Sequence, residues 1–282
     1  MAKILDGKAL SEKLKAQLAQ EVKKLQDKSG ITPGLAVVIV GEDPASQIYV
    51  RGKVRACEKV GIQSFHHALP AETSADLLKH LIEQLNQDPQ VHGILVQLPL
   101  PGALKDLKVT ELINPEKDVD GFHPISLGRL ITGEKGFRSC TPFGMMKMLE
   151  SIDYDLAGKE AVVLGRSNIV GKPMGMMLLE KNATVTYCHS KTKNLEEKIK
   201  AADVLVAAVG RPNFVPGDWI KQGAVVLDVG INRLADGKVV GDVDFEGASK
   251  RASYITPVPG GVGPMTITML LWNTVEAAKN KE

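Results

Sequence analysis

The sequence predicts an α/β fold made of two domains. Short apolar runs alternate with helical patterns along the chain, which is typical of parallel sheets covered by helices. The runs are almost continuously apolar, as in strands that are buried on both faces. A length of 282 residues suits two domains, each large enough to bury its own core.

The composition excludes several classes of function. The chain carries 35 basic and 33 acidic residues, so its net charge of +2 creates no overall field that would attract nucleic acid or an anionic membrane. An aromatic content of 4% disfavours a base-stacking surface. We therefore expect neither nucleic acid nor a membrane as a partner.

The cysteines and the first residues indicate a cytoplasmic protein. Cys57, Cys140 and Cys188 are odd in number and far apart, which fits reduced thiols and no metal site. The opening "MAKILDGKALSEKLKAQ" becomes charged too early for a signal peptide. No stretch reaches the roughly 18 apolar residues of a membrane span.

The first half of the chain reads as an initial helix followed by strands that alternate with helices. Such a series implies a parallel sheet. The expected elements are a helix over 8–28, strands over 35–41 and 62–68, a helix over 74–87, and a strand over 91–101 that runs into a proline-rich turn.

A further helix is predicted over 44–60, directly after the first strand. The Asp43 side chain can cap its free N–H groups, and Pro44 is preset for a first helical turn. Gly61 is a suitable stop.

Within this helix, Tyr49 and Lys53 form a Tyr-x-x-x-Lys pair. A spacing of four places both side chains on one face, so that an amine can lie beside a phenolic oxygen and handle protons. The alternative is that both belong to a solvated face, which also carries Arg51, Arg55 and Lys59.

A second series of buried strands follows a glycine- and proline-bearing stretch, 121–141, in which we place the domain boundary. The expected elements are a helix over 142–152 and strands over 161–165, 184–188, 204–210 and 224–230.

The first strand of this second series leads into a turn that suits a nucleotide. The turn "GRSNIVGKPMG" places Gly165, Gly171 and Gly175 between a strand and a helix, where backbone N–H groups can approach a phosphate. The turn lacks the G-x-G-x-x-G fingerprint, so an ordinary strand-to-helix turn is the alternative.

The end of the next strand favours NADP over NAD. An NAD site usually offers an acidic residue there for the ribose hydroxyls. Here the strand ends "YCHSKT", without a carboxylate, and Ser190 joins Arg166 and Ser167 as donors suited to a 2′-phosphate. His189 belongs to the same set of donors, and the alternative for it is a surface histidine at a strand end.

Three further stretches offer substrate contacts. Gln97 lies at the carboxyl end of a predicted parallel strand, where α/β folds bind ligands. Asp118 and Asp120 share a loop, and either could accept two hydrogen bonds from a planar group such as the 2-amino edge of a pterin. The turn 256–266, "TPVPGGVGPMT", gives a fixed backbone that can approach a flat ring. Each also has a purely structural alternative: a turn cap, a solvated acid and a rigid connector.

The order of these motifs disfavours one familiar explanation of the Tyr/Lys pair. Short-chain dehydrogenases use Tyr-x-x-x-Lys, but they place it well after the glycine-rich loop. Here the pair precedes that loop by about 110 residues. We therefore expect a substrate domain first and a cofactor domain second, with the chemistry in a cleft flanked by both. A non-catalytic nucleotide-binding module is the third alternative.

Seven motifs taken together resemble one family. In order, "YVRGK", "GILVQLPLP", "PEKDVDGFHP", "GRSNIVGKP", "CHSKT", "VVLDVGIN" and "TPVPGGVGPMT" are similar to the bifunctional methylenetetrahydrofolate dehydrogenase/methenyltetrahydrofolate cyclohydrolase family of one-carbon metabolism. The resemblance implies two α/β domains flanking a cleft: a substrate domain over 1–121 plus 270–282, and a Rossmann-type NADP-binding domain over 122–269. It also implies NADP-dependent oxidation of 5,10-methylenetetrahydrofolate, hydrolysis of the product to 10-formyltetrahydrofolate, and a homodimer.

The same resemblance implies roles for individual residues. Lys53 would be the acid/base residue, Tyr49 a ring stacked on the substrate, Gln97 a partner that orients the lysine, and Asp120 the pterin anchor. The implied NADP contacts are Gly165, Arg166, Ser167, Ser190 and Ile231, and the remaining substrate contacts are Leu98, Pro99, Pro259, Gly260 and Gly261.

Overall fold

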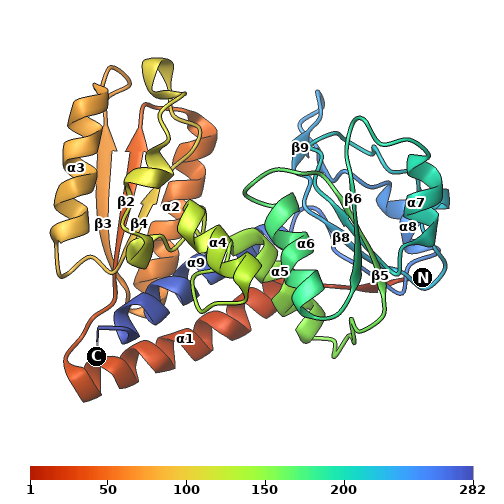
Figure 1. The fold of residues 1–282 in the computed structure, drawn as a ribbon, viewed down its shortest axis with the longest axis horizontal. Helices are drawn as coiled ribbons and strands as arrows, with labels where there is room; N and C mark the ends of the chain where they lie inside the picture. The colour runs from red at the N-terminus through yellow and green to blue at the C-terminus, as the bar shows by residue number, and fades with distance from the viewer. Residues whose placement is uncertain (282) are drawn as a thin grey trace. The chain divides into compact units, whose positions relative to one another are not determined.

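The computed structural model describes residues 1–281, which form two compact α/β units (Figure 1). Unit 1 comprises Met1–Glu12 and Thr141–Thr266. Unit 2 comprises Lys13–Cys140 and the residues from Ile267 onward. The predicted α/β class with two parallel-sheet bodies is therefore confirmed.

Unit 2 is built on a three-stranded parallel sheet in the order β3-β2-β4. Its central strand is entirely buried, as the continuous apolar run predicts. Leu78 and Ile82 of helix α3 are buried in one cluster with Val38 and Ile94 of the sheet, so α3 covers one face. The strands are β2 (Gly34–Val40), β3 (Gln63–Leu69) and β4 (Gly93–Val96), and the helices are α2 (Pro44–Val60), α3 (Ala75–Gln87) and α4 (Pro124–Thr132), with short 3₁₀ turns η1 (Gly102–Leu104), η2 (Val109–Leu112) and η3 (Pro115–Lys117).

Helix α2 begins and ends where the sequence predicts. The Asp43 carboxylate accepts a hydrogen bond from the Ser46 N–H at 2.7 Å and so caps the free N-terminus. Gly61 adopts a left-handed φ of 80°, which a glycine accepts without steric cost, and ends the helix. These two caps set the ends of helix α2.

Unit 1 is built on a six-stranded parallel sheet in the order β1-β11-β8-β7-β5-β6. Helices α7 and α8 contribute Ile199 and Ala248 to a buried cluster with Leu205 and Val226 of the sheet. The strands are β1 (Lys3–Ile4), β5 (Glu160–Leu164), β6 (Thr184–Cys188), β7 (Val204–Ala207), β8 (Val225–Asp228) and β11 (Tyr254–Ile255), with a separate antiparallel pair β9 (Asn232–Arg233) and β10 (Val239–Val240). The helices are α5 (Cys140–Glu150), α6 (Gly171–Glu180), α7 (Leu195–Ala201) and α8 (Phe245–Ser249), with the 3₁₀ turn η4 (Gly217–Trp219). Residues of α1 (Gly7–Ser29) and α9 (Val262–Lys279) are divided among the two units.

The structure adds elements that the apolar patterns do not predict. Strand β1 pairs in parallel with β11, although both strands have only two residues, too few to show a periodicity. The stretch 121–141, expected to hold the domain boundary, contains helix α4, in which the His123 ring accepts a hydrogen bond from the Ile125 N–H and Gly133 forms the left-handed end.

Two further features bear on the sequence expectations. Cys57, Cys140 and Cys188 are all buried and free of disulfides. Among residues 1–281, none of the helices combines the length and the apolar character needed to cross a membrane.

Candidate active site

The sheet of unit 2 has a topological switch point at the carboxyl ends of β2 and β4. After β2 the chain adds β3 on one side and later β4 on the other, and such a reversal of strand order is where open α/β sheets bind ligands. Gln97 follows β4 directly, and its N–H donates to the Val38 carbonyl at 2.8 Å. The sheet itself therefore places Gln97 at this point, as the sequence predicts.

Gln97 and Lys53 are joined by a hydrogen bond. The Lys53 Nζ donates to the Gln97 Oε1 at 3.0 Å, while the Gln97 Nε2 donates to the Leu98 carbonyl at 2.8 Å. The second bond turns the amide so that its oxygen faces the lysine. An ammonium group has three N–H donors, so Lys53 keeps capacity for a ligand or water.

Apolar and aromatic side chains lie exposed beside this pair in the sequence. Tyr49 lies one helical turn before Lys53 and is 45% exposed, and Leu98, directly after Gln97, is 38% exposed. Pro99 is exposed as well. Exposed rings and apolar side chains next to charged groups suit a flat, partly polar ligand.

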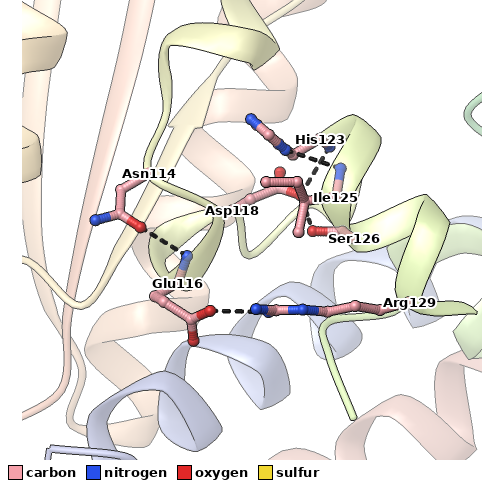
Figure 2. Close-up of polar contacts among 7 residues, drawn as sticks. All are labelled: Asn114, Glu116, Asp118, His123, Ile125, Ser126 and Arg129. Atoms are coloured by element: carbon pink, nitrogen blue, oxygen red, sulfur yellow. Dashed lines mark hydrogen bonds and ion pairs between the residues drawn. The ribbon is translucent and has the colours of Figure 1, made fainter. Parts of the chain in front are cut away.

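Asp118 organises the loop that it belongs to (Figure 2). Its carboxylate accepts hydrogen bonds from the Phe122 N–H at 3.2 Å, the His123 N–H at 2.8 Å and the Ser126 hydroxyl at 2.7 Å. Only 1% of Asp118 is exposed, and burial raises the pKa of its carboxyl to about 6 although these donors oppose the shift. Its oxygens are thus engaged inside the protein.

The Asp120 carboxylate differs from that of Asp118 in its hydrogen bonds. Within residues 1–281, no hydrogen-bond donor to its carboxylate is found, and its electrostatic neighbours are Lys53 and Asp118. Asp120 is half-buried, and its desolvation raises the pKa of the carboxyl to about 6, while the positive charge of Lys53 lowers this pKa and the negative charge of Asp118 raises it. Of the two acids that the sequence could not tell apart, Asp120 is the one with acceptors available for a ligand.

The loop around Asp120 is held by a residue that sequence reasoning missed. The Asn273 side chain, on α9, donates to the carbonyls of Val119 at 2.8 Å and Arg138 at 3.0 Å. The Ser139 hydroxyl donates to the Gly121 carbonyl at 2.8 Å. The sequence shows only an asparagine within the apolar run "MLLWNTV"; in the structure Asn273 is 3% exposed, and a buried amide needs partners.

Unit 1 has its own switch point, at β5, which lies between β6 and β7. Gly165 follows β5 with a φ of 129°, and a β-carbon there would collide with the Ala208 carbonyl oxygen, so only glycine fits. The Ser167 hydroxyl accepts from the N–H groups of Val170 at 3.1 Å and Gly171 at 3.4 Å at the start of α6. Arg166 and Ser167 are exposed, and the turn leads into a helix N-terminus, which suits a phosphate.

The turn after β6 is closed by its own side chains. The His189 N–H donates to the Thr192 hydroxyl at 2.8 Å, and the His189 ring accepts from the Lys191 N–H at 3.1 Å. His189 is half-buried, and both of these hydrogen bonds lie within the turn. Ser190 is exposed, and residues 189–192 contain no carboxylate, so the donor set that predicts a 2′-phosphate is present.

The remaining predicted contacts also belong to unit 1. Ile231 is 55% exposed. In the turn that leads to α9, Pro259 is exposed. Gly260 has a φ of 102°, and its carbonyl accepts a hydrogen bond from the Lys8 N–H at 2.9 Å. A β-carbon on Gly261 would crowd the Pro257 carbonyl oxygen at 2.5 Å. The structure thus brings Lys53, Gln97 and Asp120 together in unit 2, and places Pro259, Gly260 and Gly261 in unit 1.

These features define a class: a two-unit α/β enzyme with a Rossmann-type nucleotide-binding unit and a second unit that carries a lysine, an amide and a carboxylate. Two family models match the chain. "Tetrahydrofolate dehydrogenase/cyclohydrolase, catalytic domain" covers residues 5–120, and "Tetrahydrofolate dehydrogenase/cyclohydrolase, NAD(P)-binding domain" covers residues 139–282. The chain belongs to the tetrahydrofolate dehydrogenase/cyclohydrolase family.

Similar proteins match this chain over nearly its full length. The chain is 61% identical to bifunctional protein FolD 2 of Geobacter sulfurreducens, over 99% of this chain and 98% of that protein. A crystal structure of the bifunctional FolD enzyme from Campylobacter jejuni matches with a TM-score of 0.97 at 53% identity, covering 100% of both chains. The Trypanosoma brucei FolD structure, complexed with NADP cofactor and inhibitor, matches with a TM-score of 0.95 at 40% identity, covering 99% of this chain and 98% of that one.

These matches confirm the family predicted from the seven motifs. They also confirm a bifunctional dehydrogenase and cyclohydrolase as the kind of enzyme. The short-chain oxidoreductase alternative is not favoured.

Proposed function

We propose that this protein oxidises 5,10-methylenetetrahydrofolate with NADP and hydrolyses the methenyl product to 10-formyltetrahydrofolate. The observation that carries the proposal is the Lys53–Gln97 hydrogen bond in the neighbourhood of the Asp120 carboxylate. It joins a proton carrier, a group that orients it, and an acceptor for the substrate in one unit.

Hydrolysis is the step that needs the lysine. Water adds to the cationic methenyl carbon and must lose a proton, and a ring nitrogen must then gain one when the carbon–nitrogen bond breaks. In its neutral form the Lys53 amine takes the first proton, and the resulting ammonium returns one to the nitrogen. Gln97 keeps the Nζ in a fixed position through both transfers because its oxygen can accept from either form.

Asp120 is proposed as the anchor of the pterin ring. A carboxylate can accept two parallel hydrogen bonds from the 2-amino edge, and Asp120 has its oxygens available whereas Asp118 does not. The exposed rings and apolar groups of Tyr49, Leu98 and Pro99 would cover the flat face of the substrate. This anchoring serves both reactions.

The oxidation step depends on positioning. When bound, NADP supplies the acceptor for the hydride. The residues of this chain suit it: Gly165 leaves room for close backbone approach, Ser167 and the start of α6 face a phosphate, and Arg166 and Ser190 offer donors to a 2′-phosphate. Loss of a hydride yields a stabilised cation and requires no proton carrier, so alignment decides the rate.

The test follows both reactions in one sample. Purified protein is mixed with 5,10-methylenetetrahydrofolate and NADP, and the absorbing methenyl intermediate is monitored. We expect the intermediate to form and then decay to 10-formyl product. Absence of NADP reduction would contradict the dehydrogenase proposal, and a methenyl signal that decays no faster than without enzyme would contradict the cyclohydrolase proposal.

Two finer points belong to the same proposal. We propose a homodimer, as the family resemblance implies, and a cytoplasmic location, which the free cysteines support. Light scattering on the purified protein measures the mass directly, and a single-chain mass at working concentration would contradict the dimer.

A further inference from the structure

Two buried aspartates of unit 1 have no place in the function proposed so far. Asp228 ends strand β8 and is 4% exposed. Asp242 follows strand β10 and has no exposed surface. Acidic side chains are seldom buried this completely unless hydrogen bonds satisfy them, so their partners show what they do.

Asp242 accepts four hydrogen bonds that come from two separate loops. Its Oδ2 accepts from the N–H groups of Val209 at 2.6 Å and Gly210 at 2.9 Å, in the loop that follows β7. Its Oδ1 accepts from the Arg211 N–H at 2.9 Å and from the Asn232 side-chain amide, also at 2.9 Å, directly after the β8 loop. One carboxylate thus joins the segments that leave two neighbouring strands.

Asp228, at the end of strand β8, binds backbone N–H groups on both sides of Asp242 and in the β8 loop. Its Oδ1 accepts from the N–H groups of Gly230 and Asp242, and its Oδ2 accepts from the Val243 N–H, each at 2.9 Å. The packing is tight: a β-carbon on Gly230 would collide with the Asp242 carboxylate, and one on Gly241 would collide with the Asp228 carboxylate. The two acids therefore fix each other as well as the loops.

Ile231 lies between the two points that are held. The Gly230 N–H before it is bound by Asp228, and the Asn232 side chain after it is bound by Asp242. Ile231 itself is 55% exposed, and its Cδ1 lies 3.8 Å from the position of a β-carbon built on Gly263, at the start of α9. An exposed apolar side chain on a tightly fixed backbone is suited to contact a ligand, because little freedom is lost on binding.

We propose that Asp242 is a positioning residue for the cofactor: it fixes the loops after β7 and β8 so that Ile231 is presented to NADP. The inference rests on the proposed function and on the NADP contact that the family resemblance implies for Ile231. The loops leave the carboxyl ends of parallel strands, where open α/β sheets bind their ligands.

The hydrogen-bond pattern selects the informative variant. Each Asp242 oxygen accepts two N–H donors, so an asparagine in either orientation places its NH₂ group against two donors. Asp242→Asn keeps the size and shape of the side chain but loses the two hydrogen bonds that one carboxylate oxygen accepts. We expect its Kd for NADP, measured by titration, to rise by about tenfold or more.

A second readout separates positioning from general damage. Hydrolysis of supplied methenyl substrate needs no cofactor, so we expect Asp242→Asn to keep its rate to within about twofold. The matched control is Asp244→Asn, because Asp244 caps α8 of the same unit by accepting from the Gly247 N–H at 3.2 Å. It should keep this cap, because an asparagine oxygen caps a helix about as well as a carboxylate, and its Kd for NADP should stay within about twofold of the parent value.

A milder variant tests the inference even if Asp242→Asn does not fold. Asn232→Ala removes only the side-chain donor to Asp242 and should weaken NADP by about threefold. An unchanged Kd in Asp242→Asn, or in Asn232→Ala if Asp242→Asn does not fold, would overturn the inference while leaving the proposed function intact. A parent protein that binds no NADP would instead overturn the proposed function, and this inference with it.

Discussion

The Lys53 ammonium donates to the Gln97 amide oxygen at 3.0 Å, across 44 positions of sequence. The bond joins helix α2 to the end of strand β4, and a second bond from the Gln97 amide nitrogen to the Leu98 carbonyl decides which way the amide faces. The position of the Lys53 Nζ is thereby fixed by a neutral acceptor.

Lys53→Met should separate the two reactions. The change removes the proton carrier and keeps most of the side-chain volume, so hydrolysis of supplied methenyl substrate should fall by roughly 10²- to 10⁴-fold. Hydride transfer needs no proton carrier and should keep a substantial fraction of its rate. Both rates are measured on one preparation, together with the folate Kd.

The control for this experiment lies on the same helix. Lys59→Met changes an exposed lysine of α2 and should leave both rates within about twofold. Unimpaired hydrolysis in Lys53→Met would reject Lys53 as the catalytic group. Equal loss of both rates would make it a binding residue.

Folate affinity should depend on pH through Asp120. Its pKa is raised to about 6, with Lys53, Asp118 and the neutral Cys140 thiol as its electrostatic neighbours. Only the ionised carboxylate accepts both hydrogen bonds from the pterin, so affinity should be full above pH 7 and roughly tenfold lower at pH 5. Fluorescence titration of a folate analogue checks this. Asp120→Asn should bind weakly with a flat profile, and a parent-like profile in that variant would assign the titration to another group.

Asp120→Asn should also stabilise the protein above pH 6. The folded pKa of about 6 lies above the unfolded value of 3.8, so the unfolded chain releases its proton first, and stability falls as pH rises through this window. At pH 7.5 the ionised carboxylate costs up to about 3 kcal/mol, which the amide removes. Thermal melts at pH 7.5 and pH 4.5 should show a larger gain at the higher pH. The same gain at both values would mean that the carboxylate charge is not the cause.

The cofactor prediction concerns Arg166 and Ser190. Replacing both with alanine should weaken NADP much more than NAD, because only NADP carries the 2′-phosphate, and each charge-assisted contact contributes about 1.5–3 kcal/mol. Calorimetric titration with both nucleotides measures the ratio, with Lys193→Ala as an exposed control just beyond the β6 turn. Equal losses for the two nucleotides would remove these residues from the 2′-phosphate site.

Asn273→Ala should loosen the loop that carries Asp120. It removes both hydrogen bonds from the side chain and leaves the Val119 and Arg138 carbonyls without this donor, at a cost of about 1–3 kcal/mol in stability. Folate affinity should fall, and NADP affinity should not. Unchanged folate affinity at reduced stability would restrict Asn273 to a structural role.

Local signals made much of this fold and site predictable. Capping residues marked both ends of α2, and continuous apolar runs marked the buried strands, because each signal reflects a contact made within a few residues or within one strand. Strand β1 and helix α4 were not predicted, for the opposite reason: β1 forms only through pairing with β11, and α4 lies in a stretch whose four glycines and one proline suggest a connector.

In the site, too, local features were predictable from the sequence and long-range contacts were not. Spacing placed Tyr49 and Lys53 on one helix face, but it could not tell Asp118 from Asp120, because only the folded loop shows which carboxylate is already satisfied. The roles of Asn273 and Asp242 were hidden for a related reason. Their partners lie far away in sequence, and no short motif records such a contact.

The bond from Asn273 to Val119 sets an order of events during synthesis. The donor is made 154 residues after the acceptor, and the whole of the 141–266 segment is translated in the interval. A ribosome adds about 5–20 residues each second, so the nascent loop waits on the order of ten seconds for its partner. During that time the chain carries Lys53, Gln97 and Asp120 without the amide that fixes the loop. The pterin anchor is therefore among the last parts of the protein to mature.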